Sequence, residues 1–139
     1  MARAIAVTVA IVVVAAFASE LALAQVTPEG GTKAGAALKN PIAPSAASIA
    51  AGGATFQAKC APCHGPKADG QGTALPPGGA KPADLTRSHY KFGTSDGDIF
   101  TNIKNGILPD LNMPTWDGQI ADRDIWDLVN YLSSIRKKG

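Results

Sequence analysis

The sequence has 139 residues, which is enough for one small domain and little more. Its 13 Lys and Arg against 11 Asp and Glu give a formal net charge of +2, and without a block of basic residues this argues against a nucleic-acid-binding surface. Two cysteines are too few for the disulfide framework of a small secreted domain, for a zinc ribbon or for a four-thiolate iron–sulfur site.

The N-terminus has the three parts of a secretory signal peptide. Arg3 supplies a positive charge, residues 4–18 form an uncharged apolar run, and Ala22-Leu23-Ala24 has the A-x-A cleavage pattern. The alternative is an uncleaved membrane anchor, but a helix over this run would span only about 23 Å of a hydrocarbon core roughly 30 Å thick. We therefore expect residues 1–24 to be removed on export, so that the protein is periplasmic, begins near Gln25 and has no transmembrane segment.

Residues 25–44 are rich in glycine and proline and contain almost no large apolar side chains. Such a segment cannot bury enough surface to offset the entropy lost on ordering. We predict a flexible leader that acts as a spacer in front of a domain at residues 45–139.

The first of three helices predicted in this domain begins at Ser45 as its N-cap and runs to Cys60, with small or apolar residues on one face. It contains Gly52 and Gly53, each of which costs a helix about 1 kcal/mol relative to alanine. Close approach of another helix at Trp126, or over residues 128–131, would offset this cost. The alternative is a frayed helix that happens to contain two glycines.

The other two helices follow a long stretch rich in glycine and proline at residues 65–94, which shows no convincing strand pattern. One helix spans residues 96–105, with Ser95 as N-cap, Asp98 in a capping-box relation to it and Gly106 as the stop. The last runs from about residue 122 to 137 with a continuous apolar stripe, and Ala121 in front of it offers no side-chain cap. Short helices, a long loop and few aromatic residues make a thin core, so we expect another group to fill the centre.

Residues 60–64 read Cys60-Ala61-Pro62-Cys63-His64, the C-x-x-C-H signature of covalent c-type haem attachment. Two thiols at this spacing can add to the two vinyl groups of one haem, and His64 is then carried beneath the iron as an axial ligand. A thioredoxin-like site would need strands around the motif, and a zinc site would need two further ligands where only His89 remains as a nitrogen donor. An ordinary disulfide would leave the adjacent histidine and the missing core unexplained.

Met113 is the candidate for the second axial ligand. It is the only methionine left after residues 1–24 are removed, and Pro114 favours an extended conformation that suits a loop lying across a flat ring. A thioether opposite an imidazole raises the reduction potential, as is usual for electron transfer. The alternatives are His89 as the ligand, an open sixth site, or Met113 as a gap-filling residue.

These features resemble the class I c-type cytochromes of the monohaem periplasmic kind, over residues 48–135. Gly52 and Phe56 stand where such cytochromes place a glycine and an aromatic residue before the motif, and Met113-Pro114 is similar to their axial-ligand dipeptide. Residues 128–132 are similar to their C-terminal helix. The resemblance implies an all-α cytochrome c fold, in which three main helices and long loops wrap around one covalently bound haem.

The resemblance also implies a carbonyl near a proline that orients the axial imidazole, and Pro76 and Pro77 are the candidates. Candidates for contacts to the haem propionates are Arg87, Tyr90, Lys91 and Trp116. The expected pocket wall is apolar and consists of Phe56, Leu85, Phe92, Ile99, Phe100, Ile103, Leu108, Trp116 and Leu128.

The function that follows is one-electron transfer, with the iron cycling between Fe(II) and Fe(III) and the protein supplying ligands and a dry pocket. The resemblance implies protein partners: an electron donor such as a periplasmic dehydrogenase and an acceptor such as a terminal oxidase. We expect an electron carrier and not an enzyme. Two alternatives remain: a haem subunit bound permanently in a larger oxidoreductase complex, and an open-site haem protein with peroxidase or gas-binding activity.

Overall fold

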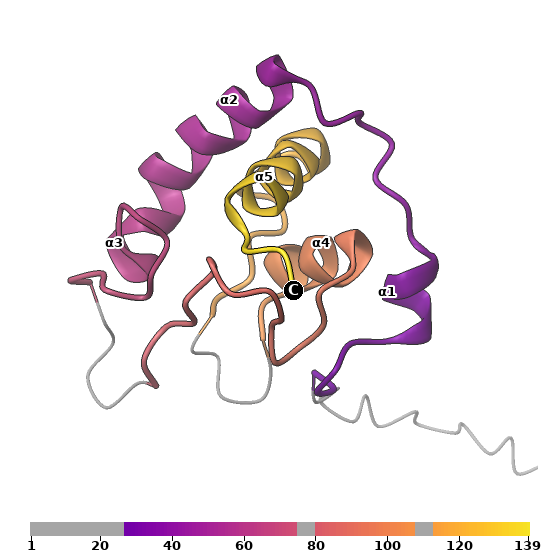
Figure 1. Ribbon diagram of the computed structural model, residues 1–139, viewed down its shortest axis with the longest axis horizontal. Coiled ribbons are helices and arrows are strands. Elements are labelled where there is room, and N and C mark those ends of the chain that lie inside the picture. Colours follow the sequence, from indigo (N-terminus) through magenta and orange to yellow (C-terminus); the bar gives the residue numbers. More distant parts are fainter. Residues whose placement is uncertain (1–26, 75–79, 108–112) are drawn as a thin grey trace, which may run out of the picture.

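The computed structural model describes residues 27–74, 80–107 and 113–139, and Figure 1 shows that these are arranged as helices joined by long loops. In chain order the elements are α1 (Lys33–Ala37), α2 (Ala46–Thr55), the π-helical turn η1 (Phe56–Cys60), α3 (Ala61–His64), α4 (Asp96–Asn105) and α5 (Asp122–Ile135). Over the described ranges the extended backbone pairs only in an isolated bridge between Ile107 and Met113. The predicted all-α fold with three main helices is confirmed.

The helix boundaries follow the capping signals in the sequence. The Ser45 hydroxyl accepts from the Ser48 backbone N–H at 3.1 Å, which starts α2 at the predicted residue. At α4, Ser95 accepts from the backbone N–H of Asp98 at 3.2 Å and donates to the Asp98 carboxylate at 2.5 Å, and Gly106 ends the helix with φ +76°. Helix α5 begins without a side-chain cap, as expected from Ala121.

Helices α2 and α5 cross at Gly52, which explains a glycine inside a helix. A Cβ on Gly52 would overlap the carbonyl oxygen of Asp127 and lie 2.9 Å from the backbone nitrogen of Leu128. At the next residue a Cβ on Gly53 would stand 3.3 Å from the Tyr131 ring, a tight contact with a side chain and not with backbone. The predicted close approach of the last helix is confirmed, and the two backbones meet at Gly52.

A buried polar network fixes the register of this crossing. The Ser48 hydroxyl on α2 donates to the carboxylate of Asp127 on α5 and accepts from the Asn130 side chain at 2.8 Å. The Asn130 side chain also accepts from Asn40 at 2.9 Å and donates to the Ile42 carbonyl at 3.1 Å. Because each of these buried groups has a partner, the network ties α2, α5 and the chain before α2 into one arrangement.

The core lies between α2, α4 and α5. Phe56 and three residues of α5 (Ile125, Leu128 and Val129) are its largest fully buried side chains. Phe100 of α4 stacks on Trp126 of α5 with ring centroids 4.0 Å apart, and Phe56 packs against Tyr131 at 5.3 Å. The apolar stripes predicted for α4 and α5 therefore meet in a single cluster, which Phe56 of the first predicted helix joins.

Residues 27–44, which we call the N-terminal strap, contain α1 and lie against the rest of the domain, at the place where the sequence predicts a flexible leader. Figure 1 shows the strap passing around α4 and α5 before it enters α2. The Asp98 carboxylate accepts from the Thr32 backbone N–H at 2.9 Å, and a Cβ on Gly35 would overlap that carboxylate. The prediction considered only apolar burial, whereas the strap is held by its backbone and small residues against buried polar groups.

Replacing Asp98 by alanine is expected to release the strap from α4. The substitution removes the acceptor of the Thr32 N–H and of the Ser95 hydroxyl, and hydrogen bonds to a buried charge stabilise more than ordinary ones. We expect the free energy of unfolding in urea to fall by about 3 kcal/mol, and trypsin to cleave faster at Lys33. Asp96→Ala, on the same turn of α4, is the matched control. Equal stability and equal cleavage in both variants would contradict this role of Asp98.

Candidate functional site

The C-x-x-C-H motif lies at a change of helix type at the end of α2. In η1 the backbone N–H of Ala61 donates to the carbonyl of Phe56, five residues earlier, which widens the turn just before the motif. Widened turns of this kind occur frequently at functional sites. Cys60 ends η1, Cys63 and His64 lie in α3, and Gly65 ends α3 with φ +80°. The three chemically active side chains are thus carried on one short helical stretch.

Both cysteines are partly buried, and Cys63 lies with its sulfur 2.8 Å from the carbonyl oxygen of Ala74. Burial, with a smaller effect of the neighbouring Cys63, raises the pKa of the Cys60 thiol to about 11. This is the opposite of the lowered thiol pKa of thioredoxin-like redox sites. In the described part of the chain no three His, Cys, Asp or Glu side chains gather into a possible metal site.

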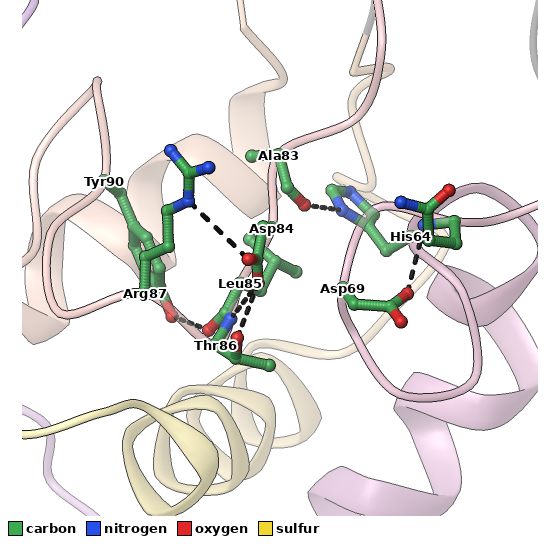
Figure 2. A network of polar contacts seen from close by, with 9 residues as sticks. His64, Asp69, Ala83, Asp84, Leu85, Thr86, Arg87 and Tyr90 are labelled. Carbon is green, nitrogen blue, oxygen red and sulfur yellow. Dashed lines mark hydrogen bonds and ion pairs between the residues drawn. The ribbon is translucent and has the colours of Figure 1, made fainter.

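The His64 ring is oriented by a backbone carbonyl. Its Nδ1 lies 3.2 Å from the carbonyl oxygen of Ala83, and Figure 2 shows the ring directed at that carbonyl. Because a carbonyl can only accept, Nδ1 carries the proton and Nε2 keeps a lone pair. Burial lowers the pKa of His64, although the hydrogen bond to Ala83 opposes this, so the ring is neutral at pH 7 and ready to bind a metal through Nε2.

The carbonyl that orients His64 was not identified from the sequence, which pointed to Pro76 or Pro77. Those two prolines lie outside the described residues. The structure uses Ala83, which directly follows Pro82, so a proline is adjacent to the carbonyl but at another place in the loop. His64 and Ala83 are 19 residues apart in sequence. The only local feature of the sequence that pointed to the Ala83 carbonyl was the proline before it, Pro82.

Met113 is held at the C-terminal end of α4. Its carbonyl accepts from the Ile107 N–H at 3.0 Å, and the Trp116 N–H donates to the Lys104 carbonyl at 3.1 Å. The Thr115 hydroxyl donates to the same Lys104 carbonyl at 2.7 Å. The Met113 side chain is partly buried and packs against the core cluster, on which Cys60 also packs. The loop between Ile107 and Met113 lies outside the described residues.

The other candidate residues have different surroundings. His89, the alternative axial ligand, is exposed. Of the propionate candidates, Arg87 pairs with Asp84 at 3.6 Å and Lys91 with Glu29 at 2.9 Å. The Tyr90 hydroxyl donates to the Leu85 carbonyl at 2.6 Å.

Most of the expected pocket wall is found in one apolar cluster. The predicted wall residues that are buried there are Phe56, Ile99, Phe100, Ile103 and Leu128, and Leu85 and Trp116 pack against it partly buried. Phe92 is partly buried outside this cluster, and Leu108 lies outside the described residues.

This set of donors fits an iron porphyrin. Two thiols and an imidazole with a free lone pair lie on one short helical stretch. Cys60 of this stretch and Met113 both pack against the apolar cluster. An apolar ring system needs such a dry wall, and imidazole with thioether is a ligand pair found in electron-transfer cytochromes.

Comparisons with known proteins agree with this chemistry. The family model described as cytochrome c oxidase, cbb3-type, subunit III matches residues 47–132, more than half of the chain. No curated protein matches the chain.

Two solved structures are similar in fold. A chain of the reducing HAO-like protein complex of Kuenenia stuttgartiensis has a TM-score of 0.60 and 26% identity, over 70% of this chain and 47% of that one. Cytochrome CL from the marine methylotrophic bacterium Methylophaga aminisulfidivorans has a TM-score of 0.54 and 20% identity, over 66% of this chain and 55% of that one. The chain therefore spans about half the length of each.

Proposed function

We propose that this chain, which belongs to the family described as cytochrome c oxidase, cbb3-type, subunit III, is a one-electron carrier of the periplasm. As a member of that family it is a c-type cytochrome with a covalently bound haem that transfers electrons. In this proposal Cys60 and Cys63 form the two thioether links. His64 and Met113 are the axial ligands of the iron.

The observation that carries the proposal is the orientation of His64. Its Nδ1–H is engaged by the Ala83 carbonyl, so the ring presents Nε2 as a neutral donor beside the two cysteines. A hydrogen bond of this kind fixes the ring orientation and increases the basicity of the ligating nitrogen. Bound in this way, the haem supplies one-electron exchange between Fe(II) and Fe(III).

Met113 is proposed as the second ligand because of how its loop is anchored. The backbone contacts to Ile107 and Lys104 hold both sides of Met113 against the end of α4. A thioether favours the ferrous state and raises the reduction potential. If His64 and Met113 both held the iron, neither of these positions would be open to a substrate, as an electron carrier requires.

Export to the periplasm is supported by the signal-peptide pattern of residues 1–24, which lie outside the described residues. None of the helices in the described part of the chain has the length and apolar character needed to span a bilayer. Covalent attachment of haem to a C-x-x-C-H motif outside the cytoplasm agrees with export.

The partners are proposed to be proteins: a donor such as a periplasmic dehydrogenase and an acceptor such as a terminal oxidase. The second candidate function is that of a haem subunit bound permanently in a larger oxidoreductase complex. The similarity to a chain of an HAO-like complex favours it.

Gel filtration of the protein from its native membranes and periplasm distinguishes a free carrier from a subunit of a complex. A free carrier elutes as a small single chain, whereas a subunit elutes with other polypeptides.

The double variant Cys60→Ala, Cys63→Ala is expected to lose covalent haem entirely. Without the two thiols no thioether can form, and the domain then lacks the group that completes its thin core. We expect a chain without the visible haem spectrum after acid–acetone extraction and with little cooperative melting by circular dichroism. Cys60→Ala alone leaves one link and serves as the comparison. A double variant that melts cooperatively without haem would contradict the role of haem in the fold.

A further inference from the structure

The carbonyl of Ala83 belongs to a short segment, residues 83–86, that is held from several sides. The Leu85 N–H donates to the Ala68 carbonyl at 2.7 Å, and the Leu85 carbonyl accepts from the Tyr90 hydroxyl at 2.6 Å. The Thr86 carbonyl accepts from the Lys137 N–H at 2.8 Å, just after the end of α5. Figure 2 shows Tyr90 approaching this segment on one side and His64 on the other.

One of these contacts ties the segment to the loop that follows His64. Ala68 is fully buried with a left-handed φ of +59°, a conformation that a residue other than glycine rarely adopts. Its N–H donates to the Gly65 carbonyl at 2.9 Å, and the Gly70 N–H donates to the His64 carbonyl at 2.8 Å. The loop after His64 is thereby closed on itself and presents the Ala68 carbonyl to Leu85.

Tyr90 is suited to hold the opposite side of the segment. It is partly buried, and the Arg136 guanidinium lies 5.7 Å from the centre of its ring. Burial raises the pKa of the Tyr90 phenol, and Arg136 offsets this only in part, so the hydroxyl stays protonated and donates at neutral pH. Asp84 adds a local turn, because its carboxylate accepts from the Thr86 N–H at 2.9 Å and from the Thr86 hydroxyl at 2.6 Å.

We propose that the Tyr90 hydroxyl and the backbone N–H of Lys137 are positioning groups for the axial imidazole, because they fix residues 83–86 so that the Ala83 carbonyl meets the His64 Nδ1–H. The inference rests on the proposed role of His64 as an iron ligand. It assigns a redox-tuning role to Tyr90, which the sequence offered only as a propionate contact, and to the segment after α5.

The expected consequence is a change in reduction potential. A carbonyl that accepts the Nδ1–H makes Nε2 a stronger electron donor, which stabilises the ferric state and lowers the potential. When residues 83–86 are less well fixed, the hydrogen bond between the His64 Nδ1–H and the Ala83 carbonyl is formed for less of the time. The reduction potential of the iron then rises. The His64 ring N–H then also exchanges faster with solvent.

Tyr90→Phe tests the side-chain contact in the haem-loaded protein. It keeps the ring and removes only the hydroxyl, so we expect an upward shift of the midpoint potential. In the ferrous protein we expect about fivefold faster exchange of the His64 ring N–H by NMR, the effect of one ordinary hydrogen bond. Tyr131→Phe is the matched control, because Tyr131 packs on Phe56 and its hydroxyl makes no hydrogen bond within the described residues.

Lys137→Pro tests the backbone contact. Proline removes the N–H that donates to Thr86, and Arg136 before it is already extended, with φ −71° and ψ 136°, as a residue before proline requires. Lys137→Ala removes the same positive charge and keeps the N–H. We expect a raised potential and faster ring exchange in Lys137→Pro and wild-type values in Lys137→Ala.

The result that overturns the inference is a potential and an exchange rate in Tyr90→Phe and Lys137→Pro that match their controls. Equal shifts in Lys137→Pro and Lys137→Ala also overturn it, because the lost charge then explains the change. The melting temperature of each variant is measured alongside, since a purely structural role would lower it without moving the potential. If the wild-type protein instead lacks a c-type haem spectrum, the proposed function itself is wrong.

Discussion

Replacement of Met113 by alanine is expected to lower the reduction potential sharply and to open the sixth position of the iron. The thioether favours the ferrous state, and axial ligands together control a range of roughly 0.8 V. The backbone contacts of Met113 and Trp116 do not depend on the Met113 side chain, so the loop is expected to stay in place. Potentiometry followed in the visible spectrum measures the fall, and carbon monoxide binding to the ferrous protein reports the open position.

Thr115→Val is the matched control for this variant. It removes the hydroxyl that donates to the Lys104 carbonyl but leaves the Met113 sulfur intact, so it disturbs the loop without removing the ligand. We expect a potential near that of the wild type and no rapid carbon monoxide binding. An unchanged reduction potential in Met113→Ala would exclude Met113 as the ligand. The sixth position of the iron would then be either bound by His89 or open.

Gly52→Ala is expected to be the most destabilising single substitution in the α2–α5 crossing. The added Cβ would overlap the carbonyl oxygen of Asp127, and neither backbone can move without disturbing the buried Ser48–Asp127 contact. We expect a loss of about 4 kcal/mol or more in the free energy of unfolding, measured by urea denaturation of the haem-loaded protein.

Gly53→Ala provides the comparison one residue away. Its Cβ meets only the Tyr131 ring at 3.3 Å, and alanine improves helix propensity by about 1 kcal/mol over glycine. We expect the Gly53 variant to remain within about 1 kcal/mol of the wild type. If the two variants are equally stable, the backbone approach of α5 at Gly52 is not as close as the structure has it.

The parts of the fold that were predictable from the sequence are those with local signals. The capping pair Ser95 and Asp98 and the stop at Gly106 gave α4 its bounds, and Ser45 gave the start of α2. The π-helical turn at the end of α2 has no comparable signal. It places Phe56 in the core and the motif cysteines beside it, and this depends on packing against α5.

The N-terminal strap shows what composition cannot indicate. Glycine and proline with few apolar side chains indicate a flexible segment, but Gly35 allows the backbone to reach Asp98, and Asn40 bonds to the side chain of Asn130. These contacts join residues far apart in sequence. A property averaged over residues 25–44 cannot reveal them.

The candidate site, like the fold, was predictable from the sequence only where a local pattern marks the residue. The motif at residues 60–64 and Met113-Pro114 are local patterns, so Cys60, Cys63, His64 and Met113 followed from the sequence as candidates. Only the folding of a long loop brings the Ala83 carbonyl to His64 and the Tyr90 hydroxyl to the carbonyl of Leu85. Nothing in the residue type of an alanine indicates that its carbonyl orients a histidine.

Mass spectrometry of the protein secreted by its native host, with a visible spectrum of the same sample, tests most directly whether residues 60–64 carry a covalent haem. We expect a coloured product that begins near Gln25 and exceeds the mass of that polypeptide by one haem, with the added mass on the peptide that contains Cys60 and Cys63. A colourless product with the mass of the bare polypeptide would contradict it.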